Sequence, residues 1–212
     1  MNSRYAGWWL MLAGTLFALA NVAVYPPQKV MELMSETGWV EQSTAAGWFL
    51  LAGLVWLLRR RDDPPASSAA LSAMFLAFGA RELDWHRAFT GTTVLRVSYY
   101  FGPAPLQHKL AALGVLTVVS LAMLRLLLTH ARQWWRAFRG GDAVAISIAA
   151  FIVTLVASKL LDRSYNVLNE DFHMALSMST KVVVSALEET LELTLTLIAL
   201  LALWQHRSRR AR

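Results

Sequence analysis

The stretch VVVSALEETLELTLTLIALLALW, residues 182–204, decides the fold. It is apolar, compatible with a helix, and long enough to cross a bilayer, since a spanning helix needs about 20 residues. Inside it lie Glu188, Glu189 and Glu192. An ionised residue at the centre of a spanning helix costs about 2.5–3.5 kcal/mol, so three unpaired carboxylates would remove most of the preference for lipid. The glutamates are therefore expected to face protein, and to be paired, protonated or in contact with trapped water.

The rest of the chain has the composition of a polytopic membrane protein. Of 212 residues, 56% are hydrophobic and only 16% are charged, which is more apolar than one soluble core of this size requires. The chain has no cysteine, so disulfides and thiolate metal sites are excluded. We expect an all-α bundle that forms a single transmembrane domain over residues 1–212.

Six apolar segments are predicted to cross the membrane. They cover approximately residues 5–25, 44–58, 67–89, 110–128, 143–161 and 182–204. The second is short, and its helix is expected to begin earlier. The first also resembles a signal peptide with a small-residue cleavage site at Ala18-Leu19-Ala20, and we interpret it as a retained helix.

Arginine placement predicts that both termini lie in the cytoplasm. Arginines gather in segments 59–61, 132–139 and 207–212, whereas the opposite connections hold most of the carboxylates, namely Glu32, Glu36, Glu41, Glu170 and Asp171. The positive-inside rule then predicts a multi-pass protein of the inner (cytoplasmic) membrane. The basic tail, residues 205–212, is expected to contact anionic lipid and not nucleic acid.

Two short motifs predict local structure. Gly140-Gly141-Asp142 is expected to end one helix and to cap the next with the aspartate side chain. After Pro26-Pro27, apolar and charged residues alternate at helical spacing over 30–41. This pattern predicts either a short amphipathic helix on the outer face of the membrane or an ordinary ordered loop.

Charged residues in three of the predicted spans are expected to lie at a similar depth in the membrane. Counting 1.5 Å per residue from the inner ends places Glu192 about 18 Å and Glu188 about 24 Å into a hydrocarbon core of about 30 Å. Arg81 and Lys159 fall at about 21 and 24 Å by the same count. A plausible network pairs Arg81 with Glu192 and Lys159 with Glu188, whereas Glu189 points about 100° away and needs a different neighbour.

The predicted site has two tiers. The buried charged cluster comprises Arg81, Glu82, Lys159, Asp162, Glu188, Glu189 and Glu192, and the outer tier comprises Asp84, His86, Arg87, His108, Arg163 and His173. Glu82 and His86 are four residues apart, and with Asp162 or His173 they would supply the three ligands of an open zinc site. Nearby cations offset these acids, which disfavours a bound dication. The sequence leaves the cofactor unknown.

These residues match no known family. Glu188-Glu189 resembles the start of the Glu-Glu-x-x-x-Arg motif of intramembrane CAAX-type proteases, but Leu193 stands where that motif requires arginine. Two histidines do not occur at helical spacing on any predicted span, which disfavours bis-histidine haem ligation.

Three functional interpretations remain. The one we adopt is binding, or proton-linked transport, of a small polar or zwitterionic species at a cluster open to the outer side. The second is a membrane hydrolase or transferase acting on a lipid head group, with Glu82, His86, Asp162 and His173 as metal ligands or acid/base groups. In the third, the charges only hold helices together in a non-catalytic structural or partner subunit.

Overall fold

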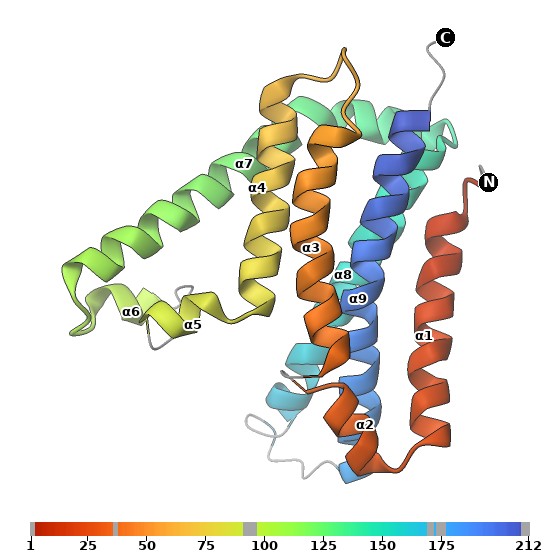
Figure 1. Ribbon diagram of the computed structural model, residues 1–212, viewed down its shortest axis with the longest axis vertical. Coiled ribbons are helices and arrows are strands. Elements are labelled where there is room, and N and C mark those ends of the chain that lie inside the picture. The colour runs from red at the N-terminus through yellow and green to blue at the C-terminus, as the bar shows by residue number, and fades with distance from the viewer. Residues whose placement is uncertain (1–2, 36–37, 91–96, 169–171, 173–176, 209–212) are drawn as a thin grey trace. The chain divides into compact units, whose positions relative to one another are not determined.

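The computed structural model describes residues 3–35, 38–90, 97–168, 172 and 177–208, and these are mostly helical (Figure 1). The helices are α1 (Ala6–Val24), α2 (Pro27–Leu33), α3 (Trp39–Leu57), α4 (Pro65–Glu82), α5 (Trp85–Thr90), α6 (Val97–Phe101), α7 (Leu106–Arg139), α8 (Ala143–Asn166) and α9 (Met178–Ser208). The all-α prediction is confirmed for this part of the chain.

Three helices are long and apolar enough to cross a membrane. They are Ala6–Val24, Leu106–Arg139 and Ala143–Ser164, and they support a membrane protein. The other three predicted spans coincide with α3, α4 and α9. The crossing of these helices, the side on which the termini lie and the identity of the membrane stay predictions.

The chain divides into two compact units, each described by itself. Unit 1 comprises Met1–Gly47 and Trp134–Arg212, and unit 2 comprises Trp48–Gln133. The boundaries fall inside α3 and near the end of α7. Whether the units act as one transmembrane domain stays a prediction.

In unit 1, α1, α8 and α9 run side by side, and small residues let them approach closely (Figure 1). A Cβ atom added to Gly7 of α1 would lie 3.1 Å from Ala150 Cβ and 3.2 Å from Ser147 Cα, both on α8. A Cβ atom on Gly14 would collide with Thr194 Oγ1 of α9. Membrane helices commonly pack through such small residues, because lipid gives little hydrophobic drive for their association.

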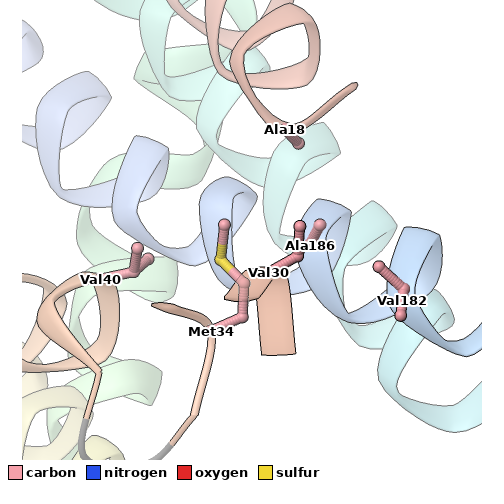
Figure 2. Packing of buried hydrophobic residues seen from close by; sticks show 6 residues of the cluster. All are labelled: Ala18, Val30, Met34, Val40, Val182 and Ala186. Carbon is pink, nitrogen blue, oxygen red and sulfur yellow. The ribbon is translucent and has the colours of Figure 1, made fainter. Parts of the chain in front are cut away.

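The short helix α2 begins at Pro27, where proline suits the first helical position because its missing amide hydrogen has no partner there. Of the two forms predicted over 30–41, the structure shows a helix that ends at Leu33, and its apolar residues pack against other helices. Val30 is fully buried and Met34 nearly so, in a cluster with residues from three other helices (Figure 2): Ala18, Val40, Val182 and Ala186. This helix therefore covers one end of α1 and α9.

The turn before α8 confirms the motif predicted there. Gly141 adopts a φ of +73°, which suits glycine, and Asp142 Oδ1 accepts a hydrogen bond of 3.0 Å from the backbone N–H of Ala145. Asp142 is the N-cap of α8.

In unit 2, the helix predicted over residues 67–89 is interrupted. Helix α4 ends at Glu82, and Asp84 follows with a φ of +47° before α5 begins at Trp85. Aspartate tolerates this left-handed conformation, and the Asp84 carboxylate contacts Arg87 Nη1 at 2.9 Å. The continuous helix expected to residue 89 is thus wrong, since neither hydropathy nor periodicity reveals a single left-handed residue.

Helix α4 packs against the later part of α3. The ring of Trp48 lies 5.5 Å from that of Phe75 and 4.9 Å from that of Phe78, between centroids. Ser72 Oγ donates a hydrogen bond of 2.7 Å to the Ala52 carbonyl oxygen. Near the start of α4, Ser67 Oγ lies 3.0 Å from His130 Nε2 of α7. These contacts hold unit 2 together.

Candidate functional site: an acidic cluster beside Lys159

Glu192 is a buried carboxylate at the contact between α8 and α9. Glu192 is 6% exposed. Its Oε1 atom accepts a hydrogen bond of 3.0 Å from Ser158 Oγ and another from Lys159 Nζ, and Lys159 and Glu192 also form an ion pair. The two donors are neighbours in the sequence of α8, and Ser158 is fully buried. Glu192 is therefore paired inside protein, as expected for a charge on an apolar helix.

The partner of Lys159 differs from the prediction. Lys159 contacts Glu192, whereas the sequence-based pairing matched it with Glu188. Depth along a helix follows from counting residues, but the partner also depends on how α8 is rotated about its axis, which counting does not give. In unit 2, Arg81 Nη1 lies 3.7 Å from Oε1 of its neighbour Glu82. The pairing of Arg81 with Glu192 stays a prediction.

Glu189 lies among like charges. Three carboxylates act on it, those of Glu192, Glu188 and Glu41, and the Lys159 ammonium opposes them. The separate neighbour expected for Glu189 stays a prediction, and Glu41 of α3 is a further carboxylate that acts on Glu189. We name Glu41, Glu188, Glu189 and Glu192 the acidic cluster, and all four belong to unit 1.

Glu41 is the member that sequence reasoning missed. The sequence places Glu41 in an outer connection, because the second predicted span begins at residue 44. Helix α3 instead begins at Trp39, so Glu41 lies in its first turn. Two features of the sequence indicate an earlier start of this helix. Acidic side chains favour the first turn of a helix, where amide hydrogens have no partner within the helix. The predicted second span is also too short to cross a membrane unless its helix begins before residue 44.

Polar side chains continue along the buried faces of α8 and α9 beyond the acidic cluster. Ser147 Oγ donates a hydrogen bond of 2.8 Å to Gln205 Oε1. Thr154 and Thr194 are buried and donate to the carbonyl oxygens four residues earlier in their own helices. Hydrogen bonds between helices, such as Ser147 to Gln205, are a usual means of association in lipid. This polar face supports the close packing of α8 on α9.

The remaining predicted site residues are dispersed or lie outside the described part. Glu82 belongs to unit 2 and Asp162 to unit 1, while the His86 side chain and His173 fall outside the described residues. His108, at the start of α7, and Arg163, in the last turn of α8, are exposed. Among the described residues, no three histidine or carboxylate side chains are placed to hold a metal ion. The zinc ligand set therefore stays a prediction.

No protein-family model matches this chain, and neither a curated protein nor a solved structure compared with it gives a match. The functional argument consequently rests on the residues of the chain alone.

Proposed function

We propose that this chain is a multi-pass membrane protein that binds a small polar or zwitterionic species at the acidic cluster, or transports it together with protons. One observation supports this proposal above the others: Lys159 of α8 pairs with the buried Glu192 of α9, and Glu188 and Glu189 lie on the same stretch of α9. The inner membrane and access from its outer side, inferred from the arginine pattern, belong to the same proposal.

The charge balance of the cluster favours an added positive charge. Like charges that are partly buried repel one another more strongly than they do in water. The Lys159 ammonium already pairs with Glu192. A proton or the ammonium group of a ligand would therefore stabilise the other carboxylates of the cluster most. Intramembrane acids that bind protons in this way are typical of transporters.

A zwitterion complements both signs of charge at this position. Its ammonium group would meet the carboxylates around Glu189, and its own carboxylate would lie toward Lys159. A neutral sugar of the same size offers neither charge. We therefore expect amino acids and betaines to bind more tightly than neutral polyols.

Ligand-induced stabilisation tests the proposal. Purified protein in detergent is melted with a panel of amino acids, betaines, polyamines and neutral polyols. A zwitterion that binds well raises the melting temperature of the wild type, because ligands that bind only the folded state stabilise it. Glu189→Gln should abolish this shift. Glu32→Gln should keep it, since Glu32 is exposed and paired with Lys29.

Proton uptake provides the second readout. A pH indicator in weakly buffered solution should report a change in bound protons when the ligand is added to wild type, and none with Glu189→Gln. If no ligand stabilises the wild type and Glu189→Gln binds as many protons as wild type, the proposal is wrong and the cluster only holds helices together.

A further inference from the structure

One end of unit 1 gathers exposed arginines from separate parts of the chain. Arg4 precedes α1, Arg136 and Arg139 lie at the end of α7, and Arg207 lies in the last turn of α9. Figure 1 shows the start of α1 and the end of α9 at the same end of this unit. A Cβ atom added to Gly141 would lie 3.5 Å from Arg4 Nη1, so Arg4 reaches the turn between α7 and α8. We name these four arginines the arginine collar.

The collar carries an excess of positive charge. Asp142 lies in the adjoining turn, where its Oδ1 atom caps α8. None of the ion pairs seen among the described residues involves a collar arginine. All four side chains are exposed, and the Arg4 guanidinium lies 4.8 Å from the centroid of the Tyr5 ring. Their planar donor geometry suits the oxygens of a phosphate.

The charge of a second arginine group in unit 2 is partly offset by two aspartates of its own loop. Arg60 Nε lies 3.2 Å from Asp62 Oδ1, and the Arg60 amide donates to Asp63 Oδ2 at 2.8 Å. Arg59 Nε donates to the Asp63 carbonyl oxygen at 3.2 Å. Two carboxylates thus accompany the three arginines at 59–61. This loop offers less net charge to an anionic surface than the collar does.

Exposed indole rings accompany the collar. Trp9, Trp135 and Trp204 are 64%, 53% and 61% exposed, and each lies within a few residues of a collar arginine on α1, α7 or α9. Tryptophan favours the boundary between acyl chains and head groups. If the indole rings lie at that boundary, the neighbouring guanidinium groups lie at the depth of the lipid phosphates.

We propose that the arginine collar binds the head groups of anionic phospholipids, and that it, more than the 59–61 loop, gives the protein its lipid selectivity. The partner follows from charge complementarity, since clustered basic residues at a membrane surface attract anionic lipid. This inference is independent of the acidic cluster and of any transported species.

The test compares lipid binding by two triple variants. Phosphatidylglycerol and phosphatidylcholine binding to detergent-purified protein is measured by native mass spectrometry. The collar variant carries Arg4→Gln, Arg136→Gln and Arg139→Gln, and the control carries Arg59→Gln, Arg60→Gln and Arg61→Gln. Each basic residue near an anionic surface contributes roughly fivefold, so the collar variant should lose on the order of 100-fold in phosphatidylglycerol affinity. The control should lose less than about tenfold.

A charge-preserving variant separates binding from misfolding. Arg4→Lys, Arg136→Lys and Arg139→Lys should retain most of the selectivity, and helical circular dichroism should be unchanged in every variant. Equal binding of the two lipids by wild type would overturn the inference, as would an equal loss in the 59–61 control. Displacement of the lipid by free glycerol phosphate at similar concentration would identify a general anion site and would also overturn it.

Discussion

At the scale of single residues, the pair of Lys159 and Glu192 shows what sequence can and cannot predict. An apolar helix with internal glutamates predicts that they are buried and paired, and Glu192 is both. Its partner could not be predicted, because the rotation of α8 decides which carboxylate lies near Lys159. The two members also differ in burial: the side chain of Lys159 is 33% exposed and that of Glu192 only 8%.

A double-mutant cycle tests this pair. Lys159→Met should destabilise the protein by about 3 kcal/mol, because it leaves a buried carboxylate without its counter-ion. Glu192→Gln should cost less, since the long lysine side chain can extend its charged end toward water. The double variant should recover most of the loss. Unfolding in mixed detergent measures all three, and strictly additive effects would contradict the pairing.

The exposed pair of Lys29 and Glu32 is the matched control. Its side chains are 50% and 70% exposed, with 2.9 Å between Nζ and Oε2. The corresponding variants Lys29→Met and Glu32→Gln should each change stability by no more than about 0.5 kcal/mol, since exposed ion pairs contribute little.

At the scale of helices, the association of α1 with α9 depends on a close approach at Gly14 that sequence analysis did not single out. A glycine in an apolar helix has no signature that tells whether it faces lipid or another helix. The structure shows the difference: Gly14 faces Thr194, whereas a Cβ atom at Gly114 of α7 would meet nothing within 4 Å.

This contrast predicts opposite effects of the same substitution. Gly14→Ala should destabilise the protein by roughly 1–3 kcal/mol, because the added methyl group collides with Thr194 and overpacks the helix contact. Gly114→Ala should be neutral or stabilise by up to about 1 kcal/mol, since alanine is the better helix former. Thr194→Ala in the Gly14→Ala background should restore part of the loss. Thermal unfolding followed by circular dichroism distinguishes these results, and equal effects at both glycines would contradict the packing.

At the scale of the whole molecule, the sequence predicts where helices occur better than it predicts the residues at which they begin and end. All six predicted spans coincide with helices, because long apolar segments carry a strong signal. Their ends depend on local backbone conformation and on packing. The left-handed Asp84 ends the third predicted span early, and the start of α3 at Trp39 places Glu41 where its charge acts on Glu189. Hydropathy and charge along the sequence show neither the backbone conformation of one residue nor which distant charges come near one another.

The orientation of the chain leads to the last prediction. In unit 1, the arginine collar lies at the end where α1 begins and α9 ends, while α2 packs with the end of α1 and the start of α9 at the other. Because arginines are retained on the cytoplasmic side, reporter fusions after Arg61, Arg139 and Arg212 should report cytoplasm. Fusions near Glu41, Val97 and Asn169 should report the outside. Termini on opposite sides would mean an odd number of crossings, and the acidic cluster would then no longer lie at the depth that proton-linked binding from the outer side requires.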